Sequence, residues 1–243
     1  MIETLLLTSA RICTFEGKRA LTNASGFFFA RGERLFLVTS RHVVFDEPSK
    51  HYPDRIEIEV HNNPENLAQS IGYSVPLYRN GKSIWRQGID SAGEIDVALV
   101  ELERAKLPVA MMYSAFTPEH LPCQSDNIEV GSSLLVPGFP LGFHDGLHHM
   151  PVVRHAIIAS SFGLRFQGEG YFLTDARTHR GTSGAPVVMR APSVKPEHGD
   201  LPWMLLGIHS ARLDVGTRDE ALDEALGLNC AWYADILLKL TDA

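Results

Sequence analysis

The chain of 243 residues carries 22 Lys and Arg against 29 Asp and Glu, so its formal net charge is −7. This negative charge argues against a partner made of nucleic acid and against an anionic membrane surface. The three cysteines are an odd number with no C-x-x-C pair, which predicts neither a disulfide framework nor a zinc site and favours a reducing, cytoplasmic location. No apolar run approaches the roughly 20 residues that span a bilayer, and the first residues do not read as a secretory signal.

Short apolar runs separated by turn residues indicate a chain built mostly from β-strands. In chain order, these runs cover residues 26–30, 35–39, 55–60, 96–102, 133–136, 152–159, 170–173, 185–189 and 204–209. Residues 31–34 and 79–82 are expected to form hairpin turns, the second with a strong Asn-Gly signal. Only residues 39–45 and 234–240 are predicted to be helical.

The number of short strands favours a β-barrel or sandwich, and about 200–250 residues is a usual length for one such all-β unit. A proline-punctuated stretch between residues 108 and 127 shows little apolar alternation. We therefore expect two β half-domains, covering residues 1–115 and 116–243, that together make one functional domain.

Ser183 lies in the segment Gly-Thr-Ser-Gly-Ala-Pro at residues 181–186. Glycines on both sides of a serine allow a tight turn in which backbone N–H groups converge, as an oxyanion hole requires. His42 follows one apolar run and Asp96 begins another. The order His42, Asp96, Ser183 is the order of the triad in double-barrel serine proteases, and it differs from the order in subtilisins and α/β-hydrolases.

The segment NASGFFFARGERLFLVTSRHVV at residues 23–44 resembles the strand, hairpin and histidine turn of chymotrypsin-fold peptidases, especially bacterial trypsin-like and HtrA-like ones. Further similarities to these peptidases lie at residues 96–99 (DVAL), 138–142 (GFPLG), 174–176 (TDA) and 227–237. The resemblance covers residues 23–240. It implies an all-β fold of two packed six-stranded antiparallel β-barrels with a short C-terminal helix.

Carried over by position, the resemblance makes Ser183 the nucleophile, His42 the general base and then acid, and Asp96 the group that orients the imidazole. The backbone N–H groups of Gly181 and Ser183 would form the oxyanion hole. Serine needs such a base to become a nucleophile, and the imidazolium that forms needs a carboxylate beside it. The implied function is a serine endopeptidase that acts on peptides or proteins without a cofactor or a metal. Because the chain reads as cytoplasmic, we also expect a narrow specificity, a regulatory protein partner or an inactive resting conformation.

The resemblance also suggests which residues line the primary specificity pocket. They are Arg177, Thr178, His209, Ser210 and Arg212, with Ser210 also near the carboxylate of Asp96. Thr178 and His209 resemble the pocket of staphylococcal glutamyl endopeptidases. A hydroxyl and an imidazole N–H can donate to a carboxylate, and an arginine can add charge. This supports a hypothesis of cleavage after Glu or Asp; alternatively, His209 simply packs between strands.

The chain differs from digestive and from HtrA members of the family, and it has one histidine-rich segment. Thr182 stands where digestive members of the family carry an aspartate, so we do not expect activation by N-terminal cleavage. The length leaves no room for the PDZ domain of HtrA proteins. The histidines at positions 144, 148 and 149 have metal-ligand residue types, but we interpret their segment as a surface loop.

A catalytically idle protease fold that binds a peptide or partner is the main alternative to a serine endopeptidase. An esterase using Ser183, Asp200 and His209 is excluded, because a strand rather than a helix is predicted after the serine.

Overall fold

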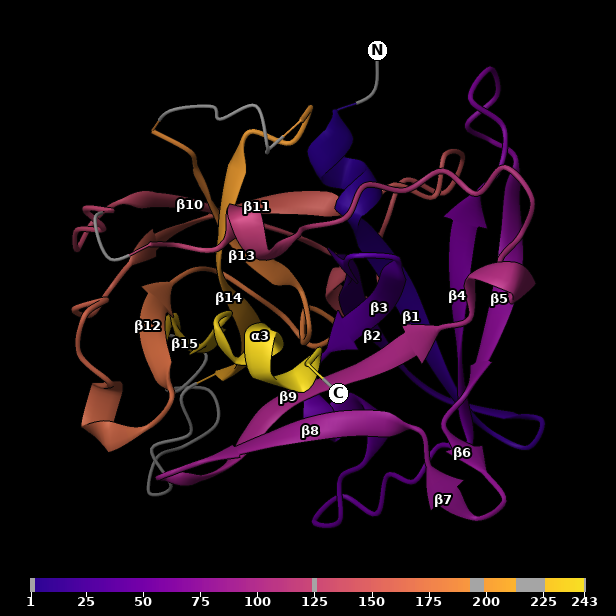
Figure 1. The fold of residues 1–243 in the computed structure, drawn as a ribbon, viewed down its shortest axis with the longest axis horizontal. Helices are drawn as coiled ribbons and strands as arrows, with labels where there is room; N and C mark the ends of the chain where they lie inside the picture. The colour runs from indigo at the N-terminus through magenta and orange to yellow at the C-terminus, as the bar shows by residue number, and fades with distance from the viewer. Residues whose placement is uncertain (1–2, 124–125, 193–198, 213–225, 243) are drawn as a thin grey trace.

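The computed structural model describes residues 3–123, 126–192, 199–212 and 226–242 (Figure 1). Its first half is a seven-stranded antiparallel sheet with strand order β5-β4-β1-β2-β3-β9-β8. The strands are β1 (Ser9–Glu16), β2 (Arg19–Arg31), β3 (Arg34–Thr39), β4 (Arg55–His61), β5 (Ser70–Pro76), β8 (Trp85–Asp90) and β9 (Gly93–Leu102). The predicted Asn-Gly hairpin joins the small pair β6 (Tyr78–Arg79) and β7 (Lys82–Ser83).

The second half is a closed antiparallel barrel with strand order β10-β11-β12-β15-β14-β13. The strands are β10 (Ser133–Gly138), β11 (Val152–Ile158), β12 (Tyr171–Asp175), β13 (Pro186–Arg190), β14 (Trp203–Arg212) and β15 (Leu228–Tyr233). These observations confirm the predicted all-β class and the six-stranded second barrel. The first half differs in detail from a six-stranded barrel, because seven strands join in its sheet.

The helices in the described residues are short and lie in the connections between strands or next to the chain ends. Two are α-helical, α1 (Arg41–Val44) and the predicted C-terminal helix α3 (Ile236–Leu240). The 3-10 turns are η1 (Thr4–Thr8), η2 (Arg104–Lys106), η3 (Pro118–His120), η4 (Pro140–Gly142) and η5 (Phe166–Gly168). None of the helices in the described part of the chain is long and apolar enough to cross a membrane.

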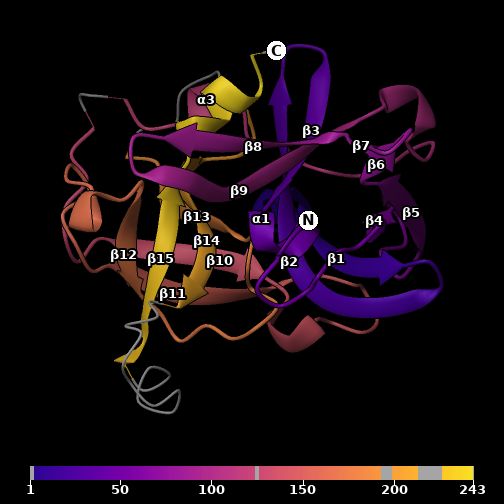
Figure 2. The ribbon, with the colours of Figure 1, turned by 90° about the horizontal axis from the view of Figure 1, so that it is seen from below.

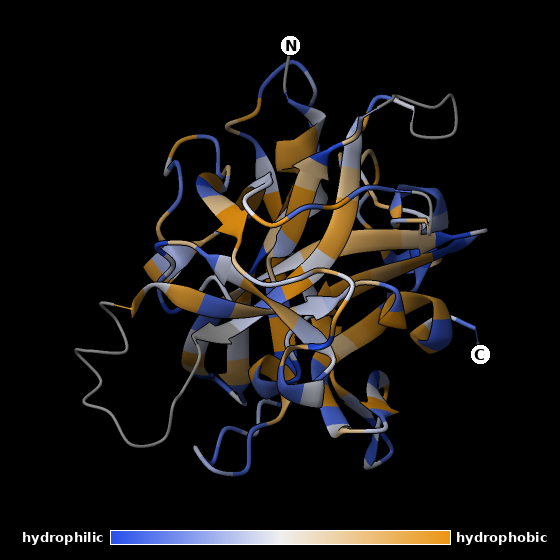
Figure 3. Cartoon of the chain, turned by 90° about the vertical axis from the view of Figure 1, so that its left-hand side faces the viewer, coloured by the Kyte–Doolittle hydropathy of each residue, from blue (hydrophilic) through white to orange (hydrophobic). Residues whose placement is uncertain are grey.

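One apolar core joins the sheet to the barrel. Phe29 and Phe36 of the first sheet belong to the same buried cluster as Leu205 and Trp232 of the barrel, and Leu237 of α3 closes it. Figure 3 shows hydrophobic colour over much of the strands, interrupted by hydrophilic residues. Burial of so many large side chains at about 25 cal/mol per Å² stabilises the contact between the two units. The residues at this junction are therefore held in a fixed relation.

The short helix α1 lies where the sheet meets the barrel (Figure 2). It directly follows β3, and its N-cap residue Ser40 donates a hydrogen bond from Oγ to the His209 carbonyl of β14 (3.2 Å). The Arg41 guanidinium holds the helix from the other side through Gln87 of β8 (2.8 Å) and Glu94 of β9 (3.1 Å). This junction is where the predicted site residues gather.

Candidate active site

His42 and Asp96 are brought together by the pairing of two neighbouring strands. β3 and β9 pair antiparallel, with Thr39 opposite Ala98, so residues just after β3 meet residues just before Ala98. His42 lies in that position on α1. Its ring Nδ1 is 2.7 Å from Asp96 Oδ2, and its backbone N–H donates to Asp96 Oδ1 at 2.9 Å. The carboxylate therefore fixes both the ring and the start of the helix that carries it.

The environment of this pair keeps the carboxylate charged and the imidazole basic. Burial would raise the pKa of Asp96, but hydrogen bonds from His42 and from the Ser210 hydroxyl lower it below its usual value. Burial would likewise lower the pKa of His42, yet the hydrogen bond and charge of Asp96 hold it above its ordinary value. The side chains are 35% and 22% exposed for His42 and Asp96, so the pair opens to solvent on one side. An imidazole in this setting can accept and return a proton near neutral pH.

Ser183 is presented to solvent by a turn that is otherwise buried. Within residues 181–188 it alone has a partly exposed side chain. Gly181 has a φ of +90° and Gly184 a φ of +86°, the left-handed region that favours glycine. A Cβ at position 181 would lie 2.6 Å from the Phe139 carbonyl oxygen, and one at position 184 would lie 2.8 Å from Thr39 Cα. Glycines are therefore required on both sides of this serine.

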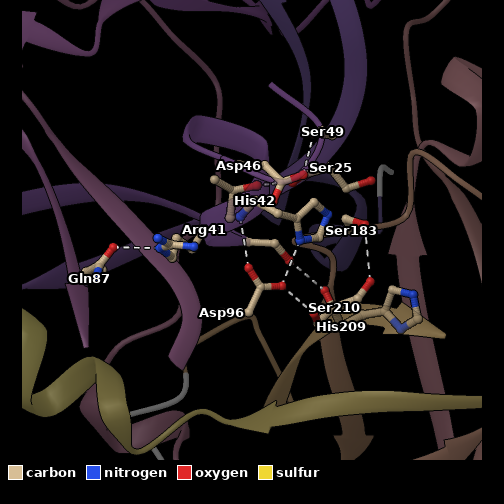
Figure 4. A network of polar contacts seen from close by, with 12 residues as sticks. Ser25, Arg41, His42, Asp46, Ser49, Gln87, Asp96, Ser183, His209 and Ser210 are labelled. Atoms are coloured by element: carbon tan, nitrogen blue, oxygen red, sulfur yellow. Dashed lines mark hydrogen bonds and ion pairs between the residues drawn. The ribbon is translucent and has the colours of Figure 1, made fainter. Parts of the chain in front are cut away.

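The hydroxyl of Ser183 donates to the backbone carbonyl of Ser210 at 3.1 Å. Among the described residues, no hydrogen bond joins this hydroxyl to the ring of His42. Figure 4 shows the His42 ring between the Asp96 carboxylate and Ser183. Catalytic hydrogen bonds are often long in unliganded enzymes and tighten when substrate binds. Rotation about the Ser183 Cα–Cβ bond changes the partner of the hydroxyl without moving the backbone.

Two backbone N–H groups in the turn at Ser183 have no protein acceptor. In the described part of the chain, neither the Gly181 N–H nor the Ser183 N–H donates a hydrogen bond to another protein group. The Arg180 carbonyl accepts from the Leu141 N–H at 2.5 Å. Because carbonyl and N–H point in opposite directions across a trans peptide, the Gly181 N–H is turned away from Leu141. Such unpaired donors beside a serine can stabilise an anionic oxygen.

The residues predicted to line the pocket have different surroundings. His209 is 2% exposed and its Nδ1 has no hydrogen-bond partner; burial, followed by the charge of His42, lowers its pKa to about 4. Thr178 is also buried, and its hydroxyl donates to Asn229 Oδ1 at 2.6 Å. Ser210 directs its hydroxyl to Asp96. Arg177 is exposed, and the side chain of Arg212 lies outside the described part of the structure.

The histidine-containing loop holds its polar groups in separate contacts. His148 Nδ1 lies 2.7 Å from Asp145 Oδ2, whereas His149 Nδ1 lies 3.2 Å from Glu59 Oε2. His144 Nδ1 contacts the Gly142 carbonyl at 2.7 Å. Within the described residues, no three His, Cys, Asp or Glu side chains are arranged to hold a metal ion.

Comparison with known proteins adds the family. The family described as "Trypsin-like peptidase domain" matches residues 24–194, a span that includes His42, Asp96 and Ser183. The chain belongs to this family. The match places it among trypsin-like serine proteases, in agreement with the barrel and with the order of the three residues.

Among solved structures, the trypsin-like chain is similar to the serine endoprotease from Yersinia pestis, with a TM-score of 0.55 and 17% sequence identity. The alignment covers 97% of this chain and 62% of that chain, so our chain spans less than two thirds of that protein. At this identity the likeness concerns the fold. No curated protein matches the chain at a significant level.

Two residues of the trypsin-like site carry contacts that sequence reasoning did not single out. Ser25 lies inside the segment that resembles the family, and its hydroxyl contacts the Gly181 carbonyl. Asn229 contacts Thr178 and also donates to the carbonyls of Ala176 and Gly227. A small polar residue within an apolar strand was the available signal for Ser25. For Asn229 the sequence had only a polar residue at the start of a strand.

Proposed function

We propose that the chain is a serine endopeptidase in which Ser183 is the nucleophile, His42 the general base and acid, and Asp96 the orienting carboxylate. The observation that carries the proposal is the 2.7 Å contact between His42 and Asp96 beside a partly exposed serine flanked by unpaired N–H groups. The family match supports the same reading. No cofactor is needed for this chemistry.

Each step of the reaction has a residue suited to it. The Ser183 oxygen attacks the scissile carbonyl carbon while its proton moves to His42 Nε2, and Asp96 stabilises the imidazolium that forms. The N–H groups of Gly181 and Ser183 stabilise the tetrahedral oxyanion. Collapse breaks the C–N bond, and His42 returns its proton to the leaving amine. Water then attacks the acyl-enzyme by the same route and releases the carboxylic acid and the free serine.

Replacement of Ser183 by alanine tests this proposal. We expect peptide hydrolysis to fall roughly 10⁴- to 10⁶-fold, because the residual rate comes only from binding and the oxyanion hole. Hydrolysis of a fluorogenic peptide library would be measured for the wild type and the variant, with thermal unfolding of both as the control for folding. Hydrolysis at the wild-type rate by Ser183→Ala would show that another group is the nucleophile.

A second candidate is a binding module without catalysis. The observation in its favour is the hydrogen bond from the Ser183 hydroxyl to the Ser210 carbonyl, which directs the hydroxyl to a group that is not a base. The two functions differ in what happens to bound peptide. A binding module leaves a peptide library intact after prolonged incubation, whereas a peptidase produces new N-termini that mass spectrometry identifies.

We further propose that the enzyme prefers Glu or Asp at the residue before the scissile bond. The support is the buried and unpartnered Nδ1 of His209, since a buried polar atom without a partner is costly unless a ligand satisfies it. With its pKa lowered to about 4, the His209 ring is neutral at pH 7 and offers a single N–H donor. The Thr178 hydroxyl is already committed to Asn229, so His209 is the principal candidate.

Hydrolysis of peptides that differ only at the residue before the scissile bond tests the preference for Glu or Asp. We expect kcat/KM for Glu to exceed that for the isosteric Gln, and His209→Leu to remove that difference. The same variant should change hydrolysis after Ala little, which provides the matched control. A preference of the wild type for Arg, Lys or Phe over Glu and Asp would contradict the proposed specificity while leaving the peptidase assignment intact.

A further inference from the structure

Ser25 connects the first sheet to the loop that precedes the candidate nucleophile. It lies in β2 and is fully buried. Its hydroxyl donates to the Gly181 carbonyl at 2.7 Å and accepts from the Phe139 N–H at 2.9 Å. One hydroxyl therefore satisfies a group of the serine loop and a group at the start of η4, both in the barrel half of the chain.

The backbone of Ser25 adds contacts on the other side of the serine. Its N–H donates to the Ser183 carbonyl at 2.9 Å. Its carbonyl accepts from the Thr39 hydroxyl at 2.8 Å, next to the α1 turn that carries His42. Ser25 thus contacts both flanks of the turn at residues 181–183.

These contacts bear on the direction of the Gly181 N–H. The peptide before Gly181 is held by the bond from the Leu141 N–H to the Arg180 carbonyl, and the peptide after it by the Ser25 hydroxyl. Because peptide groups are planar, the anchored Arg180 carbonyl fixes the direction of the Gly181 N–H in the same unit, and the anchored Gly181 carbonyl holds the next unit, so Gly181 is held on both sides. The η4 segment that supplies the Leu141 N–H is itself attached to Ser25 through Phe139. Both anchors of Gly181 therefore depend on this one hydroxyl.

We propose that Ser25 is a positioning residue that holds the Gly181 N–H in the orientation needed to stabilise the oxyanion. The inference rests on the proposed function, because an oxyanion forms only if Ser183 attacks a carbonyl. Without the hydroxyl, the Phe139 N–H and the Gly181 carbonyl lose their partner in a buried environment. The loop then has reason to rearrange, and the transition state loses stabilisation that the bound substrate does not use.

Thr14 provides a matched control. It is a fully buried residue of the same sheet, and its hydroxyl also donates to a backbone carbonyl and accepts a backbone N–H, both of Thr22. Neither contact involves the serine loop. Ser25→Ala and Thr14→Val each remove one such hydroxyl. Because the Thr22 groups are exposed whereas Phe139 and Gly181 are buried, thermal unfolding of both variants separates a loss of stability from an effect on the serine loop.

Three measurements on the full chain test the proposal. For Ser25→Ala we expect kcat to fall on the order of 10- to 100-fold, less than the loss of an oxyanion donor, with KM nearly unchanged. The affinity for a peptide boronic acid, which mimics the tetrahedral state, should fall by a similar factor. Hydrogen exchange of peptides covering residues 139–143 and 180–184 should accelerate, whereas Thr14→Val should match the wild type in all three.

The outcomes separate this inference from the proposed function. Wild-type kcat, boronate affinity and exchange in Ser25→Ala would overturn the role of Ser25 while leaving the peptidase assignment intact. Equal effects of Ser25→Ala and Thr14→Val would also overturn it. If the wild type hydrolyses no peptide, the proposed function fails, and unchanged exchange in Ser25→Ala would still show that Ser25 does not anchor the loop. Should Ser25→Ala not fold, Ser25→Cys takes its place, because a thiol is only a weak donor and a weak acceptor. Faster exchange at residues 139–143 and 180–184 together with wild-type kcat in that variant would contradict the proposal.

Discussion

Asparagine at position 96 would remove a negative charge from the centre of the site while preserving the shape of the side chain. The carboxylate accepts hydrogen bonds from the His42 N–H, the His42 ring and the Ser210 hydroxyl. An amide has only one accepting atom, so its NH₂ group would face either the imidazole or another donor. If the NH₂ group donates to His42 Nδ1, the ring proton moves to Nε2 and His42 can no longer accept the proton of Ser183.

The expected fall in kcat for Asp96→Asn is therefore nearly as large as the fall on removing the general base. A triad with the wrong tautomer loses roughly 10⁴-fold in kcat, which corresponds to about 5.4 kcal/mol in the activation barrier. Steady-state hydrolysis of a fluorogenic peptide at pH 7 measures it. Ser210→Ala is the control, because it removes only one hydrogen bond to the same carboxylate and should cost on the order of 10- to 100-fold. Activity of Asp96→Asn within tenfold of the wild type would refute the reasoning.

Two further predictions concern the oxyanion turn and the pH profile. Gly181→Ala places a Cβ 2.6 Å from the Phe139 carbonyl oxygen and 2.8 Å from the Leu141 nitrogen, so the turn must move. We expect kcat to fall on the order of 10²- to 10³-fold while the circular dichroism spectrum stays unchanged. Wild-type kcat would show that the turn accommodates the added methyl group. Because the pKa of His42 is raised and the base must be neutral, activity should be lost as the pH falls, with the acidic limb of kcat/KM above about 6.5. A limb below about 6.5 would mean that Asp96 does not outweigh burial.

The sequence was informative where strands are buried and turns are marked by glycine. β3 and β9 have nearly continuous buried apolar residues, and the hairpin at Asn80 and Gly81 has the residues that its turn requires. β1 was not predicted because its buried positions include the small or polar residues Ala10 and Thr14. β5 was not predicted because it lies at the edge of the sheet and has few buried residues. β8 was not predicted either, and the seven strands of the first sheet exceed the six that the resemblance implies.

The candidate triad was accessible from the sequence because each member lies next to a recognisable strand or glycine turn. The role of Ser25 was not accessible in this way. Its hydroxyl contacts residues 114 and 156 positions away, and only the packing of the sheet against the barrel brings them together. The proposed pocket could be predicted from the sequence only in part. Burial of His209 follows from its place in β14, but the partner of Thr178 depends on the pairing of β12 with β15.

Covalent labelling tests the central claim most directly. A fluorophosphonate reacts with a serine hydroxyl only when a neighbouring base and an oxyanion hole activate it. We expect one adduct per chain, mapped to Ser183 by peptide mass spectrometry, with strongly reduced labelling in His42→Ala and none at that position in Ser183→Ala. A folded wild-type chain that remains unlabelled at Ser183, or that is labelled equally in His42→Ala, would contradict the account.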